Sequence, residues 1–546
     1  MGNQSRPLAD YSPDIWGDKF TTIPRDTELW EAYSKERDVL KNEVRSMLVS
    51  AGGDWTDKII LIDTIERLGV GYHFSEWIED MLSEMHSAHA KLESYEKYDL
   101  FTTALYFRIF RQRGYNVASE IFEKYKETDG KFSEAITKDP VGLLSLYEAA
   151  HLRIHGEAVL DDALAFTTFH LKSMAKSSLD SGSSLARQVK RALEQPLHKG
   201  IQRIEARHFI SFYEDSASKN NVLLKFAKLD YNLLQMLYKQ ELSQVKRWWA
   251  AIDFDSKFPQ FRSRIVEASF WAVGTSFEPR FSLARIMFTK MLCALSVADD
   301  LYDTYGTIEE LNTYTKAIER LDIESIDGLA DHCKLCYTTI LNVLSEYDED
   351  LVKQGSYYDV YYLTKAFQAN MFAYHKEAIW CNENYVPPLK EYLMNGSTSS
   401  ALCTLGVSMI LGMGHVDTPR ACNWATSKPK AVLASEKMGR VINDIVGFER
   451  EHSRPNVATS IDCYMKEYGV SKEEAVVKLY ELIEDTWKDM NEECLEPTTV
   501  GRHFINVFLD SMRVCHVVYD KDSDGYTHPE ENLKHEINFI MDPIPI

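Results

Sequence analysis

The sequence predicts an all-α protein built from two helical domains. Apolar residues recur at helical spacing, strand-like alternation is almost absent, and the helical segments end at glycine or at short polar loops. The spacing is clear in the first segment, whose apolar face carries Leu29, Tyr33, Leu40, Val44 and Leu48. We find no periodic internal repeat of the kind that marks solenoid proteins.

Further helices are expected in the N-terminal half, each of ordinary length and separated by short loops. They cover residues 59–68, 103–113, 142–155, 160–175 and 201–213. The first of these ends beside Gly69 and the second beside Gly114, where glycine commonly ends a helix.

The composition becomes polar at residues 214–221, and we place the domain boundary there, giving domains of residues 1–220 and 221–546. Every cysteine and every candidate ligand lies in the second domain. The first domain has no acidic cluster with ligand spacing, since the pair Asp161 and Asp162 stands at a helix start and is explained by the helix dipole.

The composition excludes several classes of protein. With 546 residues, 45% of them hydrophobic, the chain can bury a large core. A formal net charge of −22 argues against nucleic acid and acidic membrane surfaces as partners. No apolar run approaches the roughly 18 residues of a membrane span, and the N-terminus lacks signal-peptide or transit-peptide character. We therefore expect a cytoplasmic protein, with a monomer as its oligomeric state.

The nine cysteines indicate reduced thiols, because their number is odd and they form no disulfide framework. Cys333 and Cys336 are two residues apart in a C-x-x-C pattern, but no other cysteine or histidine stands at zinc spacing.

The stretch 295–306 contains the most informative acidic cluster. Asp299 and Asp303 are four residues apart and share one face of a helix, with Asp300 beside them. Clustered carboxylates repel one another unless a cation compensates, and Mg²⁺ prefers carboxylate oxygens together with substrate phosphate. The motif predicts a magnesium site for a phosphorylated ligand, and its alternative is a solvated acidic helix end.

A second stripe follows one helix face through Arg440, Asn443, Gly447 and Glu451. An amide oxygen, a carboxylate and an arginine on one line can bind a cation and a phosphate together. Glycine inside a helix costs about 1 kcal/mol relative to alanine, and here it leaves room for water. Apolar neighbours on the same helix favour burial over the alternative of a charged outer face.

Arg262 and Arg264 flank a single residue and can fork around a phosphate. The alternative is a basic pair at the surface.

Residues 520–531 match the spacing of an EF-hand calcium loop. Thr527 stands where such loops usually place Ile or Val, Pro529 falls late in the loop, and no second hand exists. The pattern therefore does not indicate a calcium site.

Taken together, Asp299-Asp-Leu-Tyr-Asp303, Arg262-Ser-Arg264 and the stripe from Asn443 to Glu451 resemble the class I plant terpene synthases, and most closely the angiosperm sesquiterpene synthases. The resemblance covers nearly the whole chain, including segments 6–16, 61–74, 107–115, 229–235 and 524–529. It implies a catalytic C-terminal α-bundle of the class I terpenoid synthase type and an N-terminal relic α-barrel without a catalytic role. The D-x-D-D motif of protonation-initiated cyclases is absent.

The resemblance also implies roles for particular residues. The metal-binding positions would be Asp299, Asp300, Asp303, Asn443, Gly447 and Glu451. The family usually has Ser or Thr at the position of Gly447, so water would replace that ligand. The diphosphate-binding residues would be Arg262, Arg264 and Arg440. The remaining implied site residues are the pocket aromatic Trp271, the lid residues Tyr519, Asp524 and Tyr526, and the helix break at Ser399, Ser400 and Ala401.

The implied reaction is the Mg²⁺-dependent ionisation of farnesyl diphosphate, followed by carbocation cyclisation and quenching to a sesquiterpene with release of diphosphate. Three Mg²⁺ ions are expected, with Mn²⁺ as a substitute. Arg6-Pro7 stands where the plastid monoterpene group carries paired arginines, which favours the cytosol and farnesyl diphosphate. Two alternatives are a chain-elongating prenyltransferase and a catalytically retired helical protein that binds diphosphate.

Overall fold

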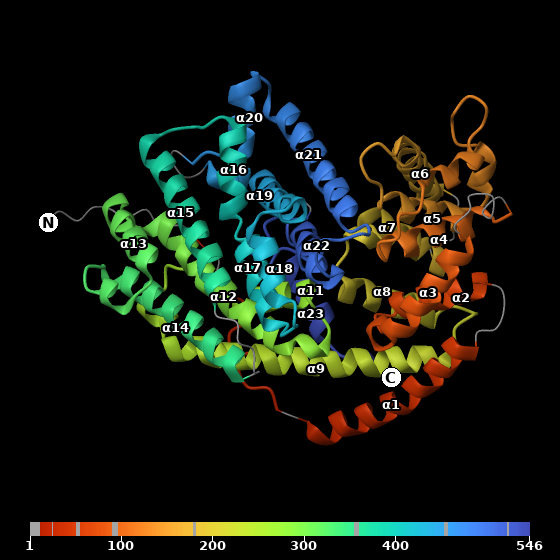
Figure 1. Ribbon diagram of the computed structural model, residues 1–546, viewed down its shortest axis with the longest axis horizontal. Helices are drawn as coiled ribbons and strands as arrows, with labels where there is room; N and C mark the ends of the chain where they lie inside the picture. The colour runs from red at the N-terminus through yellow and green to blue at the C-terminus, as the bar shows by residue number, and fades with distance from the viewer. Residues whose placement is uncertain are drawn as a thin grey trace. The chain divides into compact units, whose positions relative to one another are not determined.

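The computed structural model is helical, as the sequence predicts. It describes residues 11, 13–24, 26–50, 55–89, 97–177, 182–353, 360–452, 457–520 and 523–546. Within these ranges no strand forms, and the only β-type pairing is an isolated bridge between Lys126 and Phe132. The predicted all-α fold class is confirmed (Figure 1).

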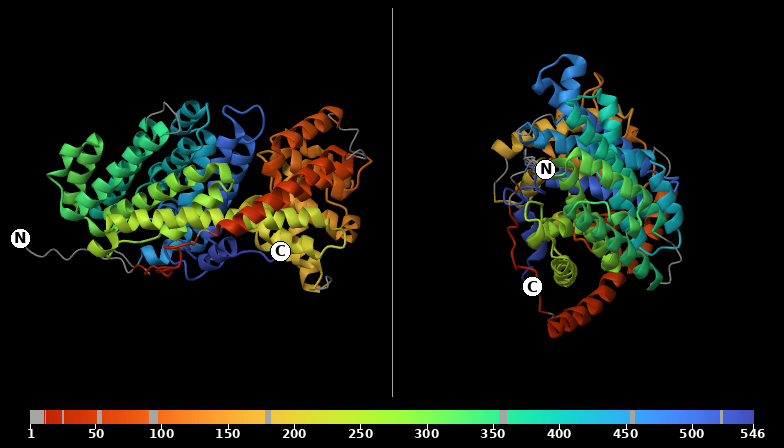
Figure 2. Two further views of the ribbon diagram at one scale, coloured as in Figure 1. Left: turned by 90° about the horizontal axis from the view of Figure 1, so that it is seen from below. Right: turned by 90° about the vertical axis from the view of Figure 1, so that its left-hand side faces the viewer.

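The chain divides into two compact units. The larger unit comprises Met1–Pro24, Leu237–Met490 and Thr499–Asn538, and the smaller comprises Arg25–Met236, Asn491–Thr498 and Phe539–Ile546. The boundary expected between residues 220 and 221 lies at the start of α9 (Asn221–Ile252), whereas the units divide inside this helix. Figure 2 shows α9 as one continuous helix. Residues 215–220 of the polar segment connect α8 to α9.

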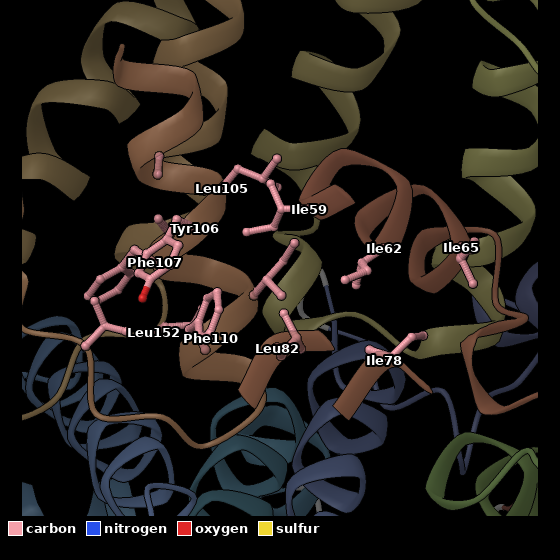
Figure 3. Packing of buried hydrophobic residues seen from close by; sticks show 14 of the residues in the cluster. Ile59, Ile62, Ile65, Ile78, Leu82, Leu105, Tyr106, Phe107, Phe110 and Leu152 are labelled. Carbon is pink, nitrogen blue, oxygen red and sulfur yellow. The ribbon is translucent and has the colours of Figure 1, made fainter. Parts of the chain in front are cut away.

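The smaller unit is a set of helices packed around a large apolar core, with a second, smaller apolar cluster at Leu143, Tyr147, Leu171, Val189 and Ala192. Its helices are α1 (Thr27–Ser50), α2 (Trp55–Arg67), α3 (Ser75–His89), α4 (Leu100–Gln112), α5 (Pro140–Ala150), α6 (Ala158–Ser177), α7 (Ser184–Glu194), α8 (Gln202–Glu214) and the start of α9. Ile59, Ile62 and Ile65 of α2 belong to the same fully buried cluster as Leu82 of α3 and Phe107 of α4 (Figure 3). The apolar spacing of the sequence therefore places these side chains inside the core.

The larger unit holds the remaining helices. They are α10 (Phe254–Lys257), α11 (Ile265–Thr275), α12 (Ser282–Asp300), α13 (Ile308–Arg320), α14 (Asp331–Lys353), α15 (Tyr361–Glu383), α16 (Leu389–Ser399), α17 (Leu402–Gly412), α18 (Thr418–Thr426), α19 (Lys430–Glu451), α20 (Ser460–Tyr468), α21 (Lys472–Glu493), α22 (Arg502–Val518) and α23 (Leu533–Met541). The last three residues of α21, 491–493, and the last three of α23, 539–541, belong to the smaller unit. Helix α12 packs against α11, α14 and α17, and α22 packs against α11, α17 and α19.

One apolar stretch is longer than the sequence analysis expected. Pro279–Tyr305 is long and apolar enough, by length and composition alone, to cross a membrane. Of its most apolar window, 89% is buried inside the protein, because α12 is surrounded by other helices of the larger unit. This burial is the ordinary position of a core helix.

Hydrogen bonds from several side chains fasten the N-terminal segment within the larger unit. The Trp16 indole N–H donates to Glu267 Oε1 at 2.6 Å. Lys246 Nζ donates to the carbonyl of Gly17 at 2.6 Å, and Ser243 Oγ donates to the carbonyl of Thr21 at 2.8 Å. These bonds explain why residues 13–24 belong to the larger unit despite their position in the sequence.

Candidate active site

Most of the predicted site residues line one cavity of about 820 Å³ in the larger unit. Those that line it are Arg262, Trp271, Asp299, Asp303, Arg440, Asn443, Glu451, Tyr519, Asp524 and Tyr526. The remaining predicted residues, Arg264, Asp300 and Gly447, do not line the cavity. The volume lies within the ordinary range for a small-molecule site.

The acidic stretch lies where α12 changes its winding. The α-helix ends at Asp300 and continues as a wider π-helical turn, η7 (Leu301–Tyr305). Asp299 and Asp303 both face the cavity across this turn. Such wider turns occur frequently at functional sites.

Asp300 has a different environment from its neighbours. Its side chain is fully buried and accepts hydrogen bonds from the backbone N–H of Arg262 at 2.6 Å and from Arg262 Nε at 2.7 Å. In this position the carboxylate holds the Arg262 loop and does not face the cavity.

Arg262 joins both aspartates at the end of α12, with Nη2 2.5 Å from Asp299 Oδ2. Burial raises the pKa of Asp299 to about 7; the Arg262 charge opposes the shift, and the carboxylates of Asp303 and Asp300 add to it. Burial also raises the pKa of Asp300, again against the effect of Arg262. The Tyr11 ring lies 4.7 Å from the Arg262 guanidinium carbon, so the N-terminal segment covers this arginine.

Arg264 is buried behind the cavity. Its Nε donates to the carbonyl of Tyr526 at 3.0 Å and its Nη2 to the carbonyl of Thr527 at 2.8 Å. Arg262 and Arg264 thus have different partners, although only Ser263 separates them in the sequence. Arg264 supports the segment 523–527.

Helix α19 presents Arg440, Asn443 and Glu451 to the cavity, as the stripe predicts. Arg440 Nε lies 3.0 Å from Asp444 Oδ1 and donates to the Tyr392 hydroxyl at 2.9 Å. Its guanidinium is therefore held in place while it faces the cavity.

Gly447 is buried, and it leaves room for a Cβ on this helix. A Cβ at this position would lie 3.6 Å from Arg450 Nη2 and 3.9 Å from Glu451 Cγ, which are ordinary van der Waals distances. A side chain or a water molecule can therefore be accommodated beside Glu451.

The helix break expected near residue 400 is present. Helix α16 ends at Ser399, Ala401 adopts a left-handed φ of 63°, and α17 begins at Leu402. Ser399, Ser400 and Ala401 all line the cavity. A left-handed alanine is strained, and such strain clusters at functional sites.

Three aromatic residues form one group in the cavity wall. Trp271 of α11 contacts Tyr519 at 6.1 Å between ring centroids and Tyr526 at 5.8 Å, both edge to face. The Tyr526 hydroxyl lies 2.5 Å from Ser296 Oγ of α12. This group supplies ring faces and edges to an otherwise apolar part of the wall.

Asp524 organises the segment 523–527, which we name the lid segment. Its Oδ1 accepts the backbone N–H groups of Tyr526 at 3.1 Å and Thr527 at 3.0 Å, and its Oδ2 accepts Arg450 Nη1 at 2.7 Å. Burial alone would raise the pKa of Asp524, but Arg450 and the hydrogen bonds of Thr527 lower it. Asp522, another position of the EF-hand-like pattern, lies outside the described residues.

Sequence reasoning missed several residues that line the cavity. They are Tyr11, Glu377, Tyr392, Asp444 and Arg450. Asp444 could have been found from its four-residue spacing to Arg440, and Arg450 from its position beside Glu451. Glu377, which lies 3.6 Å from Arg440 Nη1 and accepts the Ser399 hydroxyl at 2.7 Å, carries no comparable pattern.

The cavity residues suit a hard divalent cation that shares its coordination with a ligand. Within the described ranges, no three His, Cys, Asp or Glu side chains already converge on one metal position. Asp299 and Asp303 on one side, and Asn443 and Glu451 on α19, nevertheless offer only oxygen donors to one cavity. Mg²⁺ usually takes one or two carboxylates and completes its shell with phosphate and water, so this donor set fits it.

One cavity is thus lined by acidic and amide oxygens, by arginines and by an aromatic wall. This combination is typical of an enzyme that binds a divalent metal ion and a phosphorylated small molecule. Two family models match the chain: "Terpene synthase, N-terminal domain" over residues 15–193 and "Terpene synthase family, metal binding domain" over residues 250–489. The chain therefore belongs to the terpene synthase family, and the resemblance in the sequence is confirmed.

Known relatives agree along the full length. A valerianol synthase of Camellia sinensis and a hedycaryol synthase of Camellia brevistyla are each 45% identical over 99% of this chain and 97% of the relative. Limonene synthase in complex with 2-fluorolinalyl diphosphate superposes with a TM-score of 0.91 at 30% identity, covering 99% of this chain and 100% of the other. Isoprene synthase of grey poplar, with three Mg²⁺ ions and dimethylallyl-S-thiolodiphosphate, gives a TM-score of 0.87 at 32% identity, covering 95% and 98%.

Proposed function

We propose that this terpene synthase is a sesquiterpene synthase that ionises farnesyl diphosphate in a Mg²⁺-dependent step, cyclises and quenches the carbocation, and releases diphosphate. The observation that carries the proposal is that Asp299 and Asp303 share one cavity with Asn443 and Glu451. Full-length relatives named valerianol synthase and hedycaryol synthase support it. The proposed setting is a cytoplasmic monomer whose first domain takes no part in the chemistry.

Asp299, Asp303, Asn443 and Glu451 would hold the metal, and Gly447 would admit a water ligand. Bound Mg²⁺ would neutralise the diphosphate and make it a better leaving group. We propose three ions, the number present in the isoprene synthase structure, with Mn²⁺ as a substitute.

Arg262 and Arg440 would bind the diphosphate directly, since both guanidinium groups face the cavity. Arg264 and Asp300 would not contact the diphosphate. Arg264 would hold the lid segment in place, and Asp300 would hold Arg262 in place. Each proposed role follows from the partners that the side chain contacts.

Departure of the diphosphate leaves an allylic cation in an apolar space, where a strong base would quench it at once. Trp271, Tyr519 and Tyr526 would stabilise this cation through their ring faces, by about 2 kcal/mol for a desolvated contact. The lid segment, ordered by Asp524, would exclude water while the cation rearranges.

The test is to incubate the purified protein with farnesyl, geranyl and geranylgeranyl diphosphates and to analyse the products by gas chromatography and mass spectrometry. We expect Mg²⁺-dependent conversion of farnesyl diphosphate to a sesquiterpene. Asp299→Ala should abolish this turnover while the helical circular dichroism stays intact. Asp348→Ala, at an exposed position of α14, is the matched control. Near-normal turnover by Asp299→Ala would contradict the assignment.

The two alternatives predict different products. A chain-elongating prenyltransferase would convert isopentenyl and farnesyl diphosphates into a longer diphosphate. A retired synthase would bind diphosphate with Mg²⁺ but release no hydrocarbon or alcohol. Elongating enzymes normally carry two D-D-x-x-D motifs, whereas the second motif of this chain is N-D-x-x-G-x-x-x-E.

A further inference from the structure

Ser296 is a buried residue of α12 that lines the cavity and belongs to none of the motifs. Its Oγ donates to the carbonyl of Leu292 at 2.9 Å and lies 2.5 Å from the Tyr526 hydroxyl. Ser296 therefore joins α12 to the lid segment within the cavity wall.

The number of protons on the two hydroxyl groups fixes the direction of the hydrogen bond between them. A serine hydroxyl has one proton to donate, and a carbonyl oxygen can only accept. Because the Ser296 proton goes to Leu292, the Tyr526 hydroxyl must be the donor to Ser296 Oγ. Among the described residues, the Tyr526 hydroxyl has no other hydrogen-bond partner.

Tyr526 keeps this proton at neutral pH. Burial raises the pKa of the phenol, whereas the hydrogen bond to Ser296 and the charge of Arg262 act in the opposite direction without cancelling the effect. A protonated phenol is a far weaker base than a phenolate. Its oxygen can therefore lie beside a carbocation without quenching it at once.

The same arrangement recurs at Tyr302, a second tyrosine that lines the cavity. Its hydroxyl lies 2.7 Å from Thr315 Oγ1, which donates to the carbonyl of Leu311 at 2.8 Å. By the same count of protons, the Tyr302 hydroxyl is the donor of its pair. Both tyrosines thus direct their protons to the protein, and each can offer a ligand in the cavity its ring and its oxygen lone pairs.

We propose that Ser296 is a positioning residue of the reaction, which holds the Tyr526 hydroxyl proton and so fixes the direction of the phenol lone pairs toward the carbocation. This inference rests on the proposed function and deepens it. An oxygen dipole of fixed direction stabilises positive charge at some carbons more than at others, so Ser296 should influence which products form. It should not influence the departure of diphosphate, because its hydrogen bonds go to Leu292 and Tyr526.

The test measures the products that the full-length enzyme forms from farnesyl diphosphate and Mg²⁺, by gas chromatography and mass spectrometry, together with kcat and KM. For Ser296→Ala we expect the ratio of the main product to the remaining products to change by about twofold or more, the effect of one neutral hydrogen bond. KM should stay within about twofold of the parent value, because the contacts to the diphosphate are unchanged. Ser296→Thr keeps the hydroxyl and should retain the parent's main product.

Two further variants make the test specific. Ser511→Ala removes a buried hydroxyl of α22 that donates to the carbonyl of Val507 and lies outside the cavity lining, so it is the matched control. Tyr526→Phe removes the hydroxyl through which Ser296 is proposed to act. Ser296→Ala should therefore change the product ratio of the parent but not that of Tyr526→Phe.

Three results would overturn the inference. One is a product ratio for Ser296→Ala equal to that of Ser511→Ala. Another is the same change in product ratio when Ser296→Ala is added to Tyr526→Phe, which would show that Ser296 acts without the phenol. The third is a lower kcat and a higher KM with an unchanged product ratio, which would show that Ser296 only fastens the lid segment. If the parent enzyme forms no product from farnesyl diphosphate with Mg²⁺, the proposed function itself fails, and this result is distinct from all three.

Discussion

Asp300 and Asp303 belong to one acidic motif, yet we expect their substitution by alanine to affect different properties. Loss of Asp300 should lower the stability of the protein, whereas loss of Asp303 should abolish ligand binding. Asp300→Ala removes a fully buried carboxylate that accepts the Arg262 backbone N–H at 2.6 Å and its Nε at 2.7 Å. Removing one partner of a buried ion pair costs about 3–5 kcal/mol. Asp299 still contacts Arg262, so we expect the lower end of this range, about 3 kcal/mol. Asp303 is exposed, and its replacement by alanine should change stability by only about 0.5 kcal/mol.

Urea unfolding followed by circular dichroism measures the difference. The denaturant dependence is about 1–3 kcal/mol per molar urea for small proteins and increases with protein size, so the Asp300→Ala midpoint should fall by roughly 0.5 M or more, and the Asp303→Ala midpoint should stay near the parent value. In calorimetry with pyrophosphate and Mg²⁺, Asp303→Ala should lose ligand binding although the protein remains stable. Equal midpoints for the two variants would refute the separation of roles.

Three further predictions concern pH, helix α19 and the aromatic wall. Burial raises the pKa of Glu267 to about 7 from 4.5, so the folded protein binds this proton more tightly than the unfolded chain, and stability falls as pH rises from about 4.5 to 7. Glu267→Gln, which keeps an acceptor for Trp16, should therefore raise the free energy of unfolding at pH 8 by up to about 3 kcal/mol and change it little at pH 4.5, as urea unfolding at both pH values would check. Gly447→Ala should raise the free energy of unfolding by up to about 1 kcal/mol, because alanine is favoured over glycine inside a helix. Gly447→Ser should also lower the Mg²⁺ concentration that gives half-maximal activity. If a Mg²⁺ titration shows no difference between the two variants, this position has no ligand role. Trp271→Leu should lower kcat by about tenfold or more, and Trp271→Phe by less, in steady-state assays with farnesyl diphosphate; equal kcat values for the two variants would contradict the cation–π role.

The helices of the smaller unit could be predicted closely because their pattern is local. The expected segments 59–68 and 103–113 correspond to α2 (Trp55–Arg67) and α4 (Leu100–Gln112). The ends differ by a few residues because caps decide them. The side chain of Asp99, for example, accepts the backbone N–H of Thr102 and starts α4 before the apolar pattern becomes evident.

The division into units could not be predicted in the same way. A polar segment such as 214–221 indicates a turn, but compactness depends on contacts between residues far apart in sequence. The bond from Trp16 to Glu267 joins residues 251 positions apart and places the N-terminal segment in the larger unit. No local pattern contains that information.

Within the site, spacing predicted which helix faces meet but not what each side chain contacts. Arg262 and Arg264 have the same chemistry, yet one faces the cavity and the other donates to the carbonyls of Tyr526 and Thr527. Both residues lie in the loop that ends at the start of α11, and only their contacts in the folded protein distinguish them. A motif therefore specifies a set of available charges, and the packing of the surrounding helices determines which of them reach the ligand.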